Sequence, residues 1–150
     1  EKINYMKPIF RTDLLLLILL ILSLFTGVQI HYASHFQTCE ILHNWSLLHT
    51  IANILLFVVA ITHIKQHWAW FKTIVSSPSR KSKVTIALSV IFVMVSVTGI
   101  VLLTCVNGHK GCGGYSRIGL IHYWLGILFG VVAFLHLIGR WKILKKRVKR

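Results

Sequence analysis

The chain has very few acidic residues. Its 150 residues include only Glu1, Asp13 and Glu40 on the acidic side against 17 Lys+Arg, which gives a formal net charge of +14. Charged residues make up 13% of the chain and hydrophobic residues 55%, and the mean hydropathy is +0.72. Soluble domains are usually about a quarter charged. The composition therefore argues against a cytosolic globular domain and indicates a small polytopic membrane protein.

The excess of basic residues does not form a stripe of the kind that binds nucleic acid. Lys and Arg lie between long apolar runs, whereas nucleic-acid-binding proteins gather them on one face or along one helix. Cationic segments that flank apolar runs are typical of the cytoplasmic side of membrane proteins. We therefore expect contact with membrane lipid and no nucleic-acid partner.

Four apolar runs are long enough to cross a bilayer as helices, which takes about 20 residues each. They lie at approximately 14–31, 45–64, 84–106 and 118–138. The first follows basic residues, as in a signal peptide, but its apolar run is longer than that of a signal peptide and no convincing small-residue cleavage site follows. We therefore predict an all-α fold with four transmembrane helices in a single membrane domain, 1–150.

The distribution of Lys and Arg predicts the orientation of these spans. Fifteen of the 17 lie in the two terminal tails and in the connection after the second span, and only Lys110 and Arg117 lie in the other connections. Basic residues favour the cytoplasmic side. We expect both termini in the cytoplasm and loops 32–44 and 107–117 outside, in a multi-pass protein of the inner (cytoplasmic) membrane.

The second and fourth spans resemble each other at an offset of 73 residues, and the first and third share a weaker echo at an offset of 72. Apolar composition explains the matching Ile, Leu and Val residues, but it does not explain two aligned pairs of histidines. The sequence therefore predicts a duplicated helical hairpin that forms a four-helix bundle. The most informative matches are His49/His122, His63/His136, Trp68/Trp141 and Thr26-Gly27/Thr98-Gly99.

The two histidines of each aligned span are 14 residues apart. In a supercoiled helix with 3.5 residues per turn this is four whole turns, so both rings face the same seam, about 21 Å apart along the axis. Two facing helices with this pattern provide two stacked sites, each with one imidazole from either helix. Two trans imidazoles suit a haem iron that has no open position for substrate and that transfers electrons.

This pattern resembles the four-helix di-haem core of the cytochromes b, whose second and fourth helices each carry two histidines at this separation. The resemblance covers about residues 10–142, and the stretch 67–70, His-Trp-Ala-Trp, looks like the end of the second helix in short bacterial cytochrome b-like proteins. It implies two haem b groups with four histidine ligands: His49 and His122 for an outer haem, His63 and His136 for an inner one.

The resemblance also implies roles for residues around these ligands. Gly27 and Gly99 would let the outer porphyrin approach the first and third helices, whereas the chain has Asp13 and Thr85 at the inner counterparts. The haem propionates need cationic partners at the bundle ends. The candidates are Arg117 outside and Lys65, Arg80, Arg140 and Lys142 inside.

His67 competes with His63 for the inner site, because His63-x-x-x-His67 has the i, i+4 spacing of a helical metal site. It would either replace His63 as the inner ligand or bind a lipid headgroup, a propionate or a quinone. The repeat favours His63, since His63 pairs with His136 whereas His67 pairs with Arg140.

All three cysteines fall on the predicted outer side, which is oxidising in a bacterium. One disulfide is expected, and the pairings Cys105–Cys112 and Cys39–Cys112 both stay open. There is no Cys-x-x-Cys-His motif, so a covalently bound c-type haem is not expected. The first outer loop also offers a candidate zinc or copper site. Its ligands would be His31, His35, Cys39 and His43. The alternative is that this segment is a short helical extension that docks against an external partner subunit.

We expect a membrane electron-transfer subunit with no catalytic residues of its own, similar to the cytochrome b anchors of respiratory dehydrogenases and reductases. It would pass electrons across the membrane between a quinone or quinol pool and a redox partner subunit on the outer face. Two other classes of function stay open: a zinc or copper transporter or sensor, and a haem-free membrane anchor. A transporter normally places acids or thiols within its spans, and this chain has only Cys105 near an outer end.

Overall fold

The part of the chain that the structure describes folds into five α-helices. The computed structural model describes residues 2–36, 38–76, 80–106 and 117–148, and the side chains of 8–36, 38–73, 83–104 and 117–140. No strand occurs among these residues, which confirms the predicted all-α fold. The helices are α1 (Lys2–Phe36), α2 (Cys39–Gln66), α3 (Trp68–Ser76), α4 (Arg80–Val106) and α5 (Arg117–Val148).

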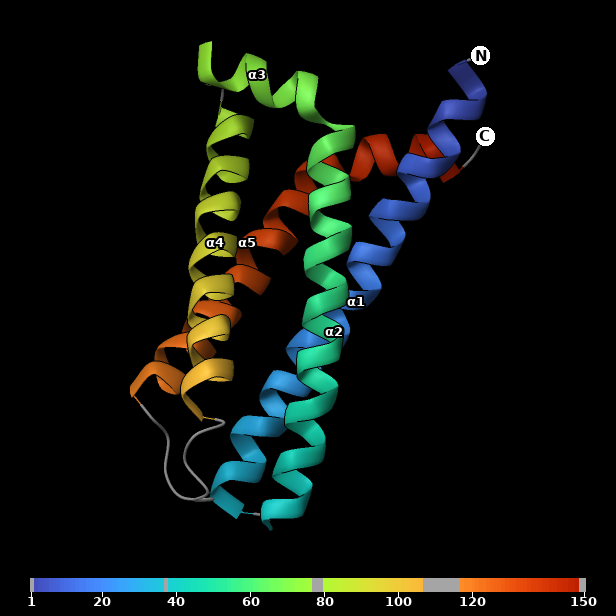
Figure 1. The fold of residues 1–150 in the computed structure, drawn as a ribbon. Helices are drawn as coiled ribbons and strands as arrows, with labels where there is room; N and C mark the ends of the chain where they lie inside the picture. The colour runs from blue at the N-terminus through green and yellow to red at the C-terminus, as the bar shows by residue number, and fades with distance from the viewer. Residues whose placement is uncertain (1, 37, 77–79, 107–116, 149–150) are drawn as a thin grey trace.

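The four long helices form a bundle of two hairpins (Figure 1). α1 packs against α2, α4 packs against α5, and the contact between α1 and α5 joins the two hairpins. Both termini and α3 lie at one end of the bundle, and the connection between α1 and α2 lies at the other. We call these the inner and outer ends, following the predicted orientation. The predicted four-helix bundle is confirmed.

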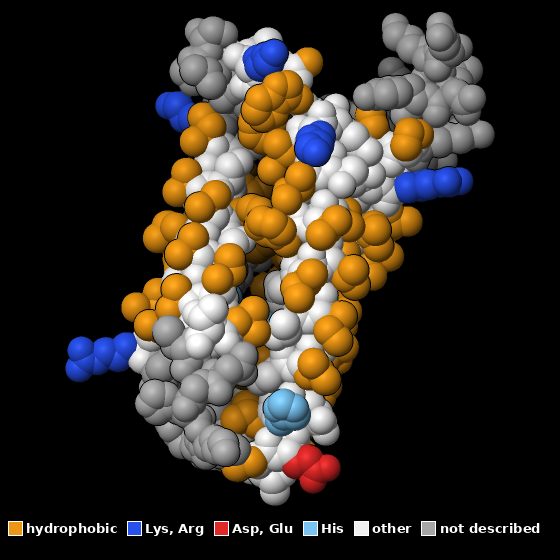
Figure 2. All heavy atoms as spheres, in the orientation of Figure 1, with side chains coloured by type: hydrophobic (Ala, Val, Ile, Leu, Met, Phe, Trp, Pro, Cys, Tyr) orange, Lys and Arg blue, Asp and Glu red, His pale blue; other side chains and the backbone are white. Residues whose placement is uncertain are grey.

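Four helices are long and apolar enough to cross a membrane, and all four predicted spans fall on them. Very few of their side chains are buried, and Figure 2 shows apolar side chains along the length of the bundle surface. Such exposure is tolerated in a bilayer, because lipid tails are as apolar as the helix surface. The fold is therefore that of a multi-pass membrane protein. The four segments are Pro8–Phe36, Cys39–Gln66, Lys83–Thr104 and Arg117–Arg140.

The first two helices extend beyond their predicted ends. The predicted outer loop 32–44 lies almost wholly in helix, because α1 continues to Phe36 and α2 begins at Cys39. This stretch contains no Gly or Pro, the residues that most strongly disfavour a helix. The segment is therefore a helical extension of the two spans, which was the alternative to a metal-binding loop. In the second outer loop, Arg117 is the first residue of α5, and the other predicted loop residues, 107–116, lie outside the described residues.

The short helix α3 was not predicted. The chain turns at His67, whose N–H bonds to the carbonyls of His63 and Ile64 at 3.1 and 3.2 Å. α3 then runs across the inner end of the bundle (Figure 1). The guanidinium carbon of Arg140, in α5, lies 4.6 Å from the centre of the Trp70 ring. This cation–π contact ties α3 to α5, and two tryptophans in one short helix are typical of a membrane interface.

The close approach of α1 to α5 depends on Gly130. A Cβ at this position would lie 2.8 Å from Leu24 Cδ1 and 3.0 Å from Leu24 Cδ2. Small residues allow helices to pack closely inside membranes. The repeat-equivalent position in α2 is Phe57, whose ring stacks on Phe92 of α4 with centroids 5.7 Å apart. The duplicated hairpins therefore differ where each meets the other.

We predict that Gly130→Leu destabilises the bundle, because the larger side chain would force α5 away from Leu24. Overpacking of this kind costs about 1–3 kcal/mol. Thermal unfolding of the purified protein in detergent would show a lower midpoint, and the additional change Leu24→Ala should restore part of it. Gly126→Leu is the matched control, since a Cβ at Gly126 meets nothing within 4 Å. Equal losses in the two glycine variants would contradict the prediction.

Candidate functional site

The outer pair of histidines meets between the two hairpins. His49 of α2 and His122 of α5 have ring centroids 6.2 Å apart, with their planes at 88°. Over the described residues α2 and α5 make no extended backbone contact, so the two rings approach each other across the space between the helices. Imidazoles bound at about 2.0–2.1 Å to opposite sides of one metal ion would have centres roughly 6 Å apart. The observed separation fits that arrangement.

A threonine of the preceding helix holds each outer histidine. Thr26 Oγ1 lies 2.8 Å from His49 Nδ1, and Thr98 Oγ1 lies 2.9 Å from His122 Nδ1. Each hydroxyl also donates to carbonyls of its own helix, those of Leu22 and Ser23 for Thr26 and those of Met94 and Val95 for Thr98.

These contacts favour a proton on Nδ1 of each outer ring. A threonine hydroxyl has a single hydrogen, which a carbonyl of its own helix can accept, and the rings of His49 and His122 also have backbone partners at Ser23 and Val95. The lone pair of each neutral imidazole is then on Nε2, the nitrogen left for a metal. A hydrogen bond on the other ring nitrogen is the usual way in which proteins orient a metal-binding histidine.

Gly27 and Gly99 lie directly against these imidazoles. A Cβ at Gly27 would be 3.3 Å from His49 Cε1, and a Cβ at Gly99 would be 3.2 Å from His122 Cε1. Each glycine follows the threonine that binds the same ring. In each Thr-Gly pair found in the sequence, the threonine hydroxyl therefore contacts the ring of an outer histidine and the glycine leaves space for that ring. Their predicted role beside a porphyrin stays a prediction.

The inner histidines have partners at equivalent places. His63 Nδ1 lies 3.0 Å from Asp13 Oδ1, and Thr85 Oγ1 lies 3.2 Å from His136 Nδ1. Asp13 and Thr85 each precede the outer threonine of the same helix by 13 residues. All four Nδ1 atoms thus face a side chain of the preceding helix, and this side chain is threonine in three cases and aspartate in the fourth.

His67 lies beside His63, as the i, i+4 spacing predicts. We call Asp13, His63 and His67 the inner cluster. The rings of His63 and His67 have centroids 4.7 Å apart. One ligand atom from each of Asp13, His63 and His67 lies within 4.8 Å of the others, close enough to hold a metal ion. It is the one such group of three among the described residues. His136 lies within electrostatic range of all three.

The predicted zinc or copper site near the first outer loop does not form. His31, His35, Cys39 and His43 are all in helices, and no three of them bring their ligand atoms together. Instead, the His31 ring stacks on Tyr123 of α5 with centroids 4.2 Å apart and planes at 11°. The outer histidine-rich segment therefore packs α1 against α5.

Cys39 is disulfide-bonded, which also removes its sulfur from any metal site. Of the two pairings left open by the sequence, Cys105–Cys112 would leave Cys39 without a partner and is therefore wrong. The partner of Cys39 itself lies outside the described residues. A disulfide at the start of α2 is the kind of bond that an oxidising compartment preserves.

The propionate candidates lie at the two ends of the bundle. Arg140 is beside Trp70 at the inner end and within electrostatic range of His136, and Arg117 is exposed at the start of α5. Lys65 is exposed near the end of α2. The side chains of Arg80 and Lys142 lie outside the described residues. Propionate binding stays a prediction for all five.

Sequence reasoning missed an aromatic cluster midway between the two histidine layers. Phe92 of α4 lies between Phe57 of α2 and Phe129 of α5, with centroid separations of 5.7 Å to each. Phe129 is seven residues from both His122 and His136 along α5. Aromatic side chains are common in apolar spans, so no sequence signal distinguished these three rings from lipid-facing ones.

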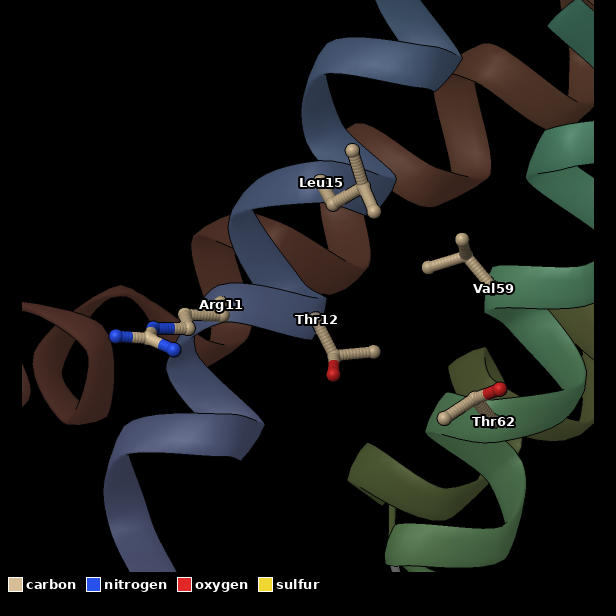
Figure 3. A pocket seen from close by; sticks show the side chains of 5 residues that line it. All are labelled: Arg11, Thr12, Leu15, Val59 and Thr62. Carbon is tan, nitrogen blue, oxygen red and sulfur yellow. The ribbon is translucent and has the colours of Figure 1, made fainter.

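A small pocket opens between α1 and α2 near the inner cluster (Figure 3). Its volume is about 200 Å³, and Thr12 and Thr62 in its wall adjoin Asp13 and His63 in the sequence. Figure 3 shows Thr12, Leu15, Val59 and Thr62 around the space between the two helices and Arg11 directed away from it.

Comparison of the chain with protein-family models, with characterised proteins and with solved structures found no match.

We predict that Thr26→Val destabilises the protein, because the substitution removes the Thr26 hydroxyl from His49 Nδ1 and leaves only the backbone of Ser23 as a partner for that ring. Loss of one hydrogen bond costs about 0.5–1.5 kcal/mol. The measurement is the unfolding midpoint of the purified protein in detergent. Thr104→Val is the matched control, because the Thr104 hydroxyl bonds only to the carbonyls of Ile100 and Val101 in its own helix. The prediction fails if the two variants lose the same stability.

Proposed function

We propose that the protein is a membrane electron-transfer subunit that binds two haem b groups. The outer haem would be held by His49 and His122, and the inner haem by His63 and His136. The observation that carries this proposal is the common arrangement of the four imidazoles, each with Nδ1 facing a side chain of the preceding helix. A haem bound by two histidines supplies an iron that gains and loses one electron without binding substrate.

The donor set fits haem iron better than a closed structural zinc site. The outer layer offers two imidazoles and no third ligand among the described residues, whereas structural zinc is bound by four protein ligands. The separation of 6.2 Å between the outer rings leaves room for one ion between them. The hairpins pack tightly within themselves, and the helices that carry the histidines stand apart, as a planar cofactor between them requires.

The centre of the bundle supports electron transfer rather than ion transport. Phe57, Phe92 and Phe129 occupy the level between the two histidine layers. An ion that crossed this level would need polar groups to replace its water. An electron needs no such groups, so an apolar barrier separates the two sites without preventing the proposed function.

A quinone is the candidate lipid-soluble partner at the inner end. The pocket between α1 and α2 is bounded by Leu15 and Val59, and its threonines, Thr12 and Thr62, adjoin Asp13 and His63 in the sequence (Figure 3). An apolar wall with a few polar groups is typical of sites that bind small ligands, and a volume of about 200 Å³ would take only part of a quinone. The remaining electron partner would be a redox subunit at the outer end. The basic inner end would face the cytoplasm, with the protein in the cytoplasmic membrane.

A second candidate function rests on the group formed by Asp13, His63 and His67. Two imidazoles and one carboxylate within 4.8 Å of one another are suitable ligands for a divalent zinc or copper ion. A sensor or transporter built on this group would use His67 as a ligand and would not need the outer pair. The first candidate therefore needs His49 and His122, whereas the second needs His67 and does not need the outer pair.

The first test of the proposal is a reduced-minus-oxidised visible spectrum of the purified protein, with haem and metals quantified. We expect two low-spin b-type haems per chain. His49→Ala should lose the outer haem, and His63→Ala should lose the inner one. His43→Ala is the control that should keep both, because His43 is exposed in α2 outside either layer.

Several results would overturn this assignment. A spectrum without a b-type signal would overturn the haem proposal, and zinc or copper bound in place of haem would favour the second candidate. If His67→Ala loses the inner haem whereas His63→Ala keeps it, His67 is the inner ligand in place of His63.

For the quinone pocket, we predict that Leu15→Trp slows reduction of the haems by a quinol, because the indole would fill the space between α1 and α2. Reduction by dithionite should be unchanged. Stopped-flow absorbance in detergent or in vesicles measures both rates. Leu14→Trp is the control, since Leu14 is an exposed neighbour that does not line the pocket. Equal quinol rates in the wild type and in Leu15→Trp would exclude this pocket as the quinone site.

A further inference from the structure

We infer that Asp13 makes the two proposed haem sites unequal, by lowering the reduction potential of the inner haem below that of the outer one. This inference rests on the proposed function. In it, Asp13 is a positioning residue that acts through His63 and does not itself touch the iron. The duplicated sequence makes the two sites alike in other respects, so the difference in their reduction potentials would come from the Asp13 carboxylate.

Four positions of the repeat are equivalent, because each places a side chain beside the Nδ1 of one histidine. Thr26, Thr98 and Thr85 each present a hydroxyl to the Nδ1 of a histidine in the next helix. Asp13 occupies the fourth position, 72 residues before Thr85, just as Thr26 is 72 residues before Thr98. Asp13 Oδ1 lies 3.0 Å from His63 Nδ1, and both atoms are buried. The substitution therefore changes the chemistry of a repeated contact without changing its place.

A carboxylate and a hydroxyl affect a metal-bound imidazole differently. A carboxylate 3.0 Å from the ring nitrogen acts through its negative charge, since neither atom has hydrogen-bond geometry here. Such a charge would stabilise the oxidised iron, which is the more positive of the two states, and so would lower its reduction potential. Burial strengthens the effect, because the interaction between charges increases as the dielectric constant falls. A neutral threonine hydroxyl has no comparable charge.

The basic groups at the inner end oppose this effect from farther away. Arg140 lies within electrostatic range of His136 and raises the potential of an inner haem, but its guanidinium is stacked on Trp70 in α3. Arg11 is exposed and lines the pocket between α1 and α2, and its guanidinium is directed away from the space between these helices (Figure 3). Since the Coulomb interaction falls with distance, the carboxylate in contact with His63 dominates. An electron shared by the two haems would therefore rest on the outer one.

The test is a potentiometric titration of the purified full chain at one fixed pH. In the wild type we expect two haem components with separate potentials. Asp13→Asn and Asp13→Thr should raise the lower potential and leave the higher one unchanged, and Asp13→Thr should bring the two closest together. The same shift should occur in a His49→Ala background, where the inner haem alone remains. Thr85→Ser keeps the hydroxyl and is the control that should shift neither potential.

If the Asp13 variants lose the inner haem, a reciprocal variant still tests the inference. Thr26→Asp places a carboxylate at the equivalent outer contact and should lower the potential of the outer haem. The inference is overturned if the Asp13 variants keep both haems with both potentials unchanged, or if Thr26→Asp leaves the outer potential where it was. A wild-type protein without haem would overturn the proposed function itself, whereas two haems with insensitive potentials would overturn this inference alone.

Discussion

The contacts made by the histidine Nδ1 atoms set the arrangement of the bundle. An imidazole inside a membrane span is costly unless both of its nitrogens are used, and here the preceding helix supplies a partner for one of them in each of the four cases. Each contact also fixes the relative height of two antiparallel helices, α1 against α2 and α4 against α5. The other nitrogen of each outer ring, Nε2, can bind a group that lies between the hairpins.

The helices pack closely within each hairpin and make fewer contacts between the hairpins. Glycine follows each outer threonine, so that the imidazole can lie against the helix backbone. Contact between the hairpins is more limited: α1 meets α5 closely at Gly130, and α2 meets α4 through the stacked rings of Phe57 and Phe92. Because lipid does not drive helices together as water does, a bundle in a membrane can keep space between its halves.

Duplication gives the two hairpins the same plan, and a few substitutions make them different. Asn53 donates to the carbonyl of His49 and accepts from Ser23 in the first hairpin, whereas its repeat-equivalent in the second hairpin is Gly126. Asp13 stands where the second hairpin has Thr85. These differences lie beside the histidines and at the contact between hairpins, so they change the surroundings of the histidines while the helices keep their places.

The sequence by itself determined the four spans, the bundle and the meeting of His49 with His122, because long apolar runs must be helical in a membrane and a 14-residue spacing places two rings on one seam. It did not determine where α1 and α2 end, that α3 forms, that Cys39 is bonded, or that Asp13 and Thr85 face the inner histidines. Those features depend on contacts between residues far apart in the chain. Only the tertiary structure decides them, because the relative height and rotation of neighbouring helices are set by packing and by single polar contacts, which the periodicity of one helix does not reveal.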